Sequence, residues 1–142
     1  MSLKNVNTFL ATACVLFVLW LGLSFILAPE TSTQGVGLPT WPAGNGDGFL
    51  IMKGTRELSM GLVIGILLLT GHRRALGWVL LMEAVAPFGD MINVLAHHGS
   101  MAAAFGIHGL TSSVIVITGL LILRETGKAH EAPAPHPAAQ HA

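Results

Sequence analysis

Residues 75–96, ALGWVLLMEAVAPFGDMINVLA, are long and apolar enough to cross a lipid bilayer, yet they contain two carboxylates. A helix of this length extends about 33 Å, slightly more than the ~30 Å hydrocarbon core of a membrane. Three further apolar runs occupy residues 8–27, 54–70 and 102–123. The four runs together predict four membrane-spanning helices.

The composition supports a protein that has lipid as its solvent. Of 142 residues, 52% are hydrophobic and 10% are charged, against roughly 25% charged residues in soluble domains. Seven Lys and Arg balance seven Asp and Glu, and no basic tract indicates a nucleic-acid partner. Cys14 is the single cysteine, so an intrachain disulfide and a Cys-rich zinc site are excluded.

The distribution of Lys and Arg predicts the orientation of the four spans. Only Lys53 and Arg56 fall on the side opposite to the N-terminus, and the other five basic residues share its side: Lys4, Arg73, Arg74, Arg124 and Lys128. Both termini are therefore expected in the cytoplasm. Short links at 71–74 and 97–100 imply antiparallel neighbours. The predicted fold class is all-α, an antiparallel four-helix bundle that is integral and multi-pass in the inner (plasma) membrane.

Two segments are expected to lie outside the helices of this membrane domain, which covers residues 1–123. Residues 28–53 are rich in Gly and Pro without a periodic pattern, and we expect an outer loop, which at this length is usually functional or disordered. Either Trp41 anchors this loop at the membrane interface, or the loop caps the mouth of the bundle. Residues 124–142 are rich in Pro, Ala and His and are predicted to form a disordered cytoplasmic tail.

Polar residues in the third apolar run fall on one face of the expected helix. Glu83, Asp90 and His97 are spaced by seven residues, and seven residues turn a helix through about 700°, close to two full turns. An aspartate at the centre of a membrane helix costs about 2.5–3.5 kcal/mol, so this face should point into the bundle or a wet cavity. Pro87 should kink the helix beside Asp90.

Counting residues from the helix ends places Arg56, Asp90 and His108 at one level in the outer half of the bundle. We therefore expect an ion pair between Arg56 and Asp90. As candidate catalytic residues, Asp90 or His108 would carry a proton and Arg56 would stabilise an anion. Further candidate binding residues are Glu57, Glu83, Asn93, His97 and Ser112. No HExxH or HxxxH spacing is present, so no metal site is assigned, and the cofactor is unknown.

The stretch from "KGTRELSMGLVIG" through "GDMINVLAHHG" to "AAFGIHGLTSS" resembles a family of small four-helix membrane proteins described only as a domain of unknown function. The family is similar in general outline to DoxX-like membrane proteins. The resemblance covers roughly residues 10–123 and rests on Gly54-x-Arg56-Glu57, Gly89-Asp90 and His108. It implies a fold and a membrane location, but no reaction.

Three functions remain open from the residues alone, and whether the chain is an enzyme is among the open points. The first is a pocket that binds a lipophilic small molecule and acts on it by acid–base chemistry, as an isomerase or cyclase would. The second is a small proton-coupled transport or channel-forming subunit that uses Glu83 and Asp90, and that is expected to act as a homo-oligomer because four helices enclose little volume. The third is an accessory scaffold whose buried ion pair is purely structural.

Overall fold

The computed structural model describes residues 3–40 and 44–130, and within these ranges the chain is helical without strands. Three helical stretches are long and apolar enough to span a membrane: Leu3–Leu27, Arg73–Ala96 and Met101–Gly127. The fold class is therefore all-α, and the chain is a membrane protein. The elements in chain order are α1 (Leu3–Leu27), α2 (Pro29–Thr33), α3 (Gly46–Leu69), α4 (Arg73–Glu83), α5 (Val85–Ala96), α6 (Met101–Ala103), the π-helical turn η1 (Ala104–Gly109) and α7 (Leu110–His130).

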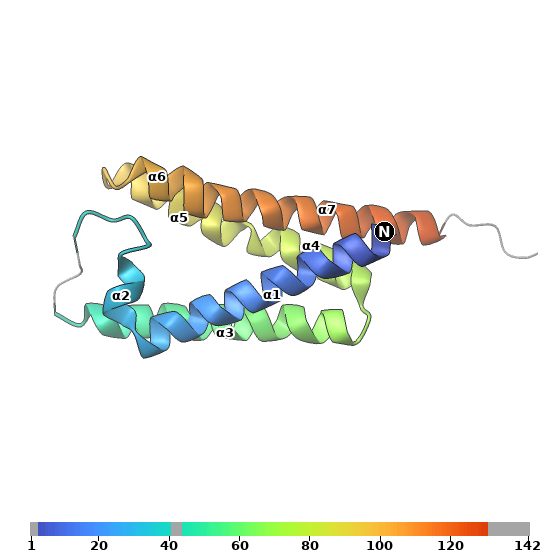
Figure 1. Ribbon diagram of the computed structural model, residues 1–142, viewed down its shortest axis with the longest axis horizontal. Coiled ribbons are helices and arrows are strands. Elements are labelled where there is room, and N and C mark those ends of the chain that lie inside the picture. The colour runs from blue at the N-terminus through green and yellow to red at the C-terminus, as the bar shows by residue number, and fades with distance from the viewer. Residues whose placement is uncertain (1–2, 41–43, 131–142) are drawn as a thin grey trace, which may run out of the picture.

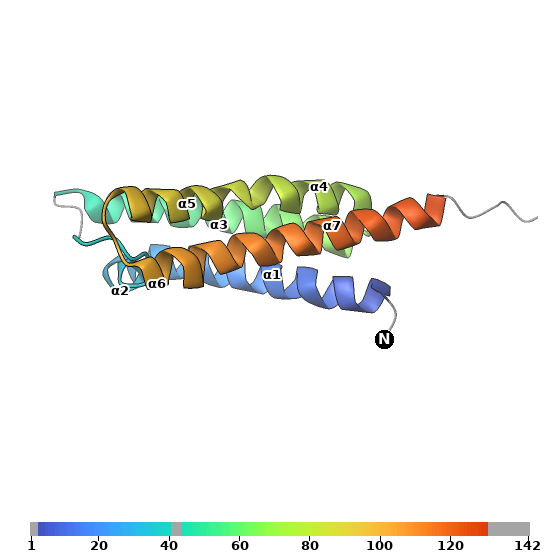
Figure 2. The same cartoon turned by 90° about the horizontal axis from the view of Figure 1, so that it is seen from above.

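The long helices lie along one common axis (Figures 1 and 2). We call the end that carries the α3–α4 link the inner end and the end that carries α2 the outer end. Helix α3 is apolar along most of its length, but Lys53, Arg56 and Glu57 lie near its outer end, and it is not among the three stretches above.

Helix α1 changes partners along its length, and this divergence shapes the site. Near the inner end, Asn7 donates hydrogen bonds to the Leu121 carbonyl (3.2 Å) and to Glu125 (2.7 Å) of α7. Near the outer end, α1 packs backbone to backbone on α3, because a Cβ at Gly22 would lie 2.7 Å from the Leu58 nitrogen and one at Gly54 would lie 2.6 Å from the Gly22 oxygen. Helix α1 therefore crosses from α7 to α3 and diverges from the outer part of α7 (Figure 1).

An ion-pair cluster joins α1, α4 and α7 at the inner end. Arg73 Nε and Glu125 Oε1 lie 2.7 Å apart, and Arg73 Nη2 donates to Glu125 Oε2 at 2.8 Å. Arg73 Nη1 also donates to the Thr8 hydroxyl at 3.2 Å. Two guanidinium nitrogens that contact one carboxylate restrict the geometry of the pair. The pair, together with Asn7, therefore sets the distance between three helices.

The third apolar run is broken at Ala84, between α4 and α5. Pro87 lies in the first turn of α5 and cannot donate a hydrogen bond to the Glu83 carbonyl, which agrees with the interruption that the proline predicts. The buried Ser112 hydroxyl of α7 donates to the Ala84 carbonyl at 2.9 Å. A side chain of the neighbouring helix thus holds the break in place.

Several helix limits differ from those expected from hydropathy. Helix α3 begins at Gly46 rather than 54, and the expected outer loop 28–53 also contains α2. Asp47 lies in the first turn of α3, where a negative charge favours helix formation. Helix α7 continues to His130, so the chain is helical beyond 124. The rest of the expected disordered tail, from 131 onward, and Trp41 lie outside the described residues.

Candidate functional site

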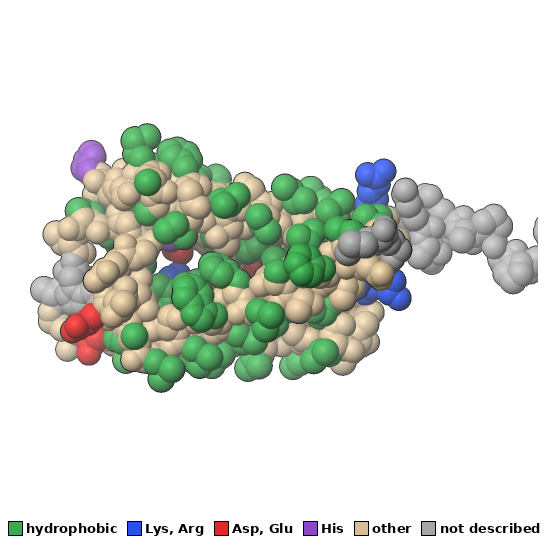
Figure 3. Space-filling view, in the orientation of Figure 1, with side chains coloured by type: hydrophobic (Ala, Val, Ile, Leu, Met, Phe, Trp, Pro, Cys, Tyr) green, Lys and Arg blue, Asp and Glu red, His purple; other side chains and the backbone are tan. Residues whose placement is uncertain are grey.

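A cavity of about 750 Å³ lies between α1 and the outer part of α7. Its walls are mainly apolar, and α1 contributes residues from Cys14 to Leu27, about 20 Å of helix. Figure 3 shows a hollow on this face with charged side chains at its floor, between hydrophobic groups on either side. The cavity is therefore open sideways, toward the surface where lipid would lie.

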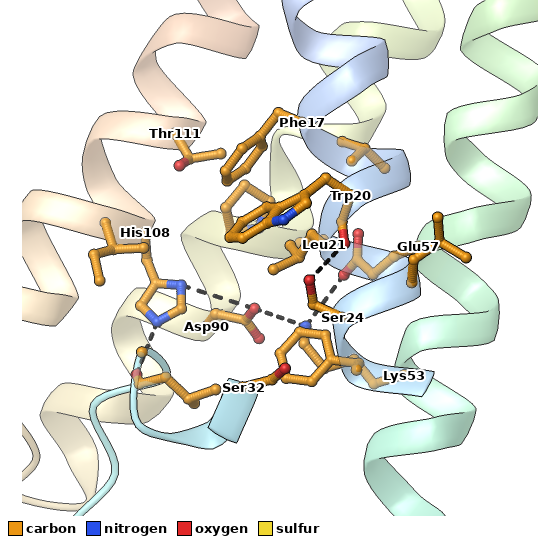
Figure 4. Close-up of a pocket in the computed structure, with 18 of the residues that line it drawn as sticks. Phe17, Trp20, Leu21, Ser24, Ser32, Lys53, Glu57, Asp90, His108 and Thr111 are labelled. Carbon is orange, nitrogen blue, oxygen red and sulfur yellow. Dashed lines mark hydrogen bonds and ion pairs between the residues drawn. The ribbon is translucent and has the colours of Figure 1, made fainter. Parts of the chain in front are cut away.

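Charged groups converge at the outer end of the cavity (Figure 4). The Lys53 ammonium group donates to Asp90 Oδ2 at 3.0 Å and to Glu57 Oε1 at 3.2 Å. The side chain of Asp90 is 36% exposed and that of Lys53 is 30% exposed, so both groups remain accessible from the cavity. Glu83 also lines the cavity, closer to the middle of the molecule. The site thus combines one cation with three carboxylates.

His108 approaches the same carboxylate from the opposite side. It is 8% exposed, and its Nδ1 lies 3.9 Å from Asp90 Oδ2, while its Nε2 lies 2.9 Å from the Val36 carbonyl oxygen. His108 belongs to η1, a turn of π-helix within the otherwise α-helical run from Met101 to His130. Such turns occur frequently at functional sites.

Helix α2 and the segment after it close the outer end of the cavity. Thr31, Ser32 and Val36 line it, and Gly37 accepts a hydrogen bond from the Ser100 nitrogen at 2.8 Å. Gly37 has a φ of 86°, a conformation that L side chains rarely adopt, and a Cβ there would overlap Ala103. Part of the expected outer loop therefore caps the mouth of the site.

The structure brings together four of the predicted site residues and separates the other four. Asp90, His108, Glu57 and Glu83 all line the cavity. Arg56 does not: it is exposed and outside the cavity wall, and Lys53 pairs with Asp90 in its place. The expected Arg56–Asp90 pair is therefore wrong. Lys53 lies one helical turn before Glu57 and on the same face of α3, whereas Arg56, directly before Glu57 in the sequence, lies on a different face.

The remaining three candidates, Asn93, His97 and Ser112, are not among the residues that line the cavity, and each makes a hydrogen bond within the fold. Asn93 is exposed outside the cavity, and its carbonyl oxygen lies 2.9 Å from Nδ1 of the exposed His97 at the end of α5. Ser112 does not line the cavity, and its hydroxyl donates a hydrogen bond to the Ala84 carbonyl. Within residues 3–40 and 44–130, no group of three or more His, Cys, Asp or Glu side chains is arranged to hold a metal ion.

Sequence reasoning missed Lys53 and the aromatic wall. The lack of a periodic pattern predicts a loop up to Lys53, although the spacing Lys53–Glu57 is the i, i+4 arrangement of a helical ion pair. Phe17, Trp20 and Phe25 of α1 line the cavity, but nothing in a uniformly apolar run distinguishes cavity-facing aromatics from lipid-facing ones.

These features define a class of protein: a small, all-helical membrane protein with a mainly apolar cavity. The cavity has polar groups at one end and is open at the side of the bundle. Residues 15–122 match the model of the family described as "Domain of unknown function (DUF4267)", and the chain belongs to this family. No curated protein and no solved structure matches the chain. The similarity in outline to DoxX-like proteins stays a prediction.

Proposed function

We propose that the chain crosses the inner membrane four times as an antiparallel bundle. In this arrangement α3, the second span in chain order, crosses the membrane in addition to the three stretches named above, and both termini lie in the cytoplasm. The bias of Lys and Arg supports this orientation. The short links from Leu69 to Arg73 and from Ala96 to Met101 support antiparallel neighbours.

Single cysteines in a Cys14→Ala background test this topology. In intact cells, a membrane-impermeant maleimide should label the Asp47→Cys variant, whereas the Arg74→Cys variant should react only after lysis. The reverse pattern would show that the orientation is inverted, and labelling of both in intact cells would show that α3 does not cross the membrane.

We propose that the cavity binds a lipophilic small molecule that enters from the bilayer. The observation that carries this proposal is a cavity of about 750 Å³ with apolar walls and a few convergent polar groups at one end. Small-molecule sites commonly have this volume and this lining. The lateral hollow (Figure 3) gives such a molecule a path that avoids water.

Asp90 and His108 are the groups that we propose to carry protons if the bound molecule is turned over. Both reach the cavity from different helices and lie close to one another. General acid–base catalysis requires such groups within hydrogen-bond reach of the reacting atom. Arg56 does not have the anion-stabilising role that the sequence predicts for it, because Lys53 is the cation beside Asp90.

The alternative of a purely structural outer ion pair is less well supported. The helices are already joined by the Arg73–Glu125 pair at the inner end, where both side chains are about 15% exposed. The Lys53–Asp90 pair is more exposed and lines the cavity. No specific observation favours the transport alternative, and a homo-oligomer stays a prediction.

Native mass spectrometry of the purified protein tests whether the cavity holds a ligand. Wild type should retain a defined small molecule that Asp90→Asn loses, and the control Asp47→Asn, an exposed carboxylate of the same helix end as Lys53, should keep it. If wild type and Asp90→Asn both carry only bulk lipid, the binding proposal is wrong.

A further inference from the structure

Several polar side chains of the cavity wall offer lone pairs rather than protons. The Ser24 hydroxyl donates its proton to the Trp20 carbonyl at 2.8 Å, and the Ser32 hydroxyl donates its proton to the Ala28 carbonyl at 2.8 Å. Both serines line the cavity, and each can offer it only lone pairs, because a hydroxyl has one proton.

His108 adds another acceptor. A carbonyl oxygen only accepts hydrogen bonds, so the contact with Val36 requires that Nε2 carries the proton. In the neutral ring, Nδ1 then has a lone pair. Nδ1 faces Asp90 Oδ2 across 3.9 Å, which is too long for a hydrogen bond. With the ring neutral, two acceptors face each other, and a donor placed beside both would satisfy them.

The formal charge of the wall is negative. Lys53 is the single Lys or Arg side chain among the cavity-lining residues, whereas Glu57, Glu83 and Asp90 contribute three carboxyl groups. Two N–H groups of Lys53 are engaged by Asp90 and Glu57. A carboxylate in a poorly solvated site needs a compensating positive charge or a proton. The wall is thus suited to a cationic donor and unsuited to an anion.

Two aromatic rings of α1 lie next to this polar end, at the exposed side of the cavity, where Trp20 is 61% exposed. Phe17 and Trp20 project from α1 over the space between His108 and Glu57 (Figure 4). The faces of aromatic rings attract cations, and tryptophan does so most strongly. The same rings also provide apolar surface for the body of a lipophilic molecule.

We propose that the ligand of this cavity is a lipophilic amine, whose ammonium group binds beside Asp90 and His108 near Trp20 and whose apolar body lies along α1. This inference rests on the proposed binding function and specifies its ligand class. The lone pairs of the wall, the excess of carboxylates and the adjacent aromatic rings each favour an ammonium group. The same features disfavour a carboxylate or phosphate head.

Three probes with one tail test the inference: dodecylamine, 1-dodecanol and dodecanoic acid. Each is titrated into the protein in phosphatidylcholine nanodiscs, and occupancy is measured by native mass spectrometry. Wild type should bind dodecylamine most tightly and dodecanoic acid least. Asp90→Asn should weaken dodecylamine by about tenfold or more, because it removes a charge-assisted hydrogen bond, while Asp47→Asn should leave it unchanged. Glu83→Gln, which retains Asp90, serves as a second charge-removing variant should Asp90→Asn fold poorly, and it should also weaken dodecylamine.

The outcomes separate the two proposals. Tighter binding of dodecanol or dodecanoic acid than of dodecylamine, abolished in the Asp90→Asn variant, would overturn the amine inference and leave the binding function intact. Equal dodecylamine binding by wild type and both charge-removing variants would also overturn it. Binding of none of the three probes, with no co-purified molecule in wild type, would overturn the binding function itself.

Discussion

Replacing Glu125 with alanine removes the carboxylate that joins three helices at the inner end. Glu125 accepts from Arg73 Nη2 at 2.8 Å and from Asn7 at 2.7 Å, and its other oxygen lies 2.7 Å from Arg73 Nε. Arg73 is 15% exposed and Asn7 is fully buried. Removing one partner of a buried ion pair leaves the other without compensation and costs about 3–5 kcal/mol. We expect Glu125→Ala to lower the free energy of unfolding by an amount near the lower end of this range, because the pair lies at an end of the molecule.

Unfolding by SDS in mixed micelles, followed by tryptophan fluorescence, measures this loss. Arg124→Ala is the matched control: it removes a charge from the exposed neighbouring residue and should change the free energy of unfolding by less than about 0.5 kcal/mol. The double variant Arg73→Met/Glu125→Leu should recover much of the loss, since an apolar pair can replace a buried ion pair. A Glu125→Ala effect no larger than that of the control would refute the assignment of this cluster as the structural ion pair.

Two further substitutions test how the helices are held around the cavity. Ser112→Ala removes the buried bond to the Ala84 carbonyl and should cost about 1 kcal/mol in the same unfolding assay, whereas Ser113→Ala, at an exposed hydroxyl, should cost much less. Gly22→Leu places atoms where the backbone of α3 lies and should abolish a stable α1–α3 contact, measured as loss of monodisperse protein, while Gly48→Leu, with open space around it, should not. Equal effects within either pair would contradict the packing described.

The fold class could be predicted from hydropathy because the apolar runs are long and nearly free of charge. The start of α3 could not, because Gly46, Asp47, Gly48 and Lys53 flank the four apolar residues 49–52 and interrupt the pattern, although the helix runs through them. The prediction of Arg56 as the partner of Asp90 fails because the depth of a residue does not specify which side of its helix faces the cavity. Lys53, which does face it, falls within the segment predicted to be a loop.

The candidate site was partly predictable for a similar reason. Asp90 and His108 could be found because polar residues in apolar runs are rare and costly. The cap formed by Val36 and the cavity between α1 and α7 depend on the angle at which α1 crosses from one helix to another. That angle arises from Gly22 and Gly54 at one end and from Asn7 at the other, which are contacts between distant parts of the chain.

Photolabelling with a small apolar aryl diazirine in nanodiscs tests most directly whether lipid-soluble molecules reach the cavity. Val18 is 8% exposed and Ile115 is 6% exposed, and both line the cavity. Leu76 is fully buried in the core and does not line it. The account predicts that Val18 and Ile115 are labelled along with the outward-facing side chains, while Leu76 is not. Labelling confined to outward-facing side chains, with Val18 and Ile115 as protected as Leu76, would contradict a cavity open to the bilayer.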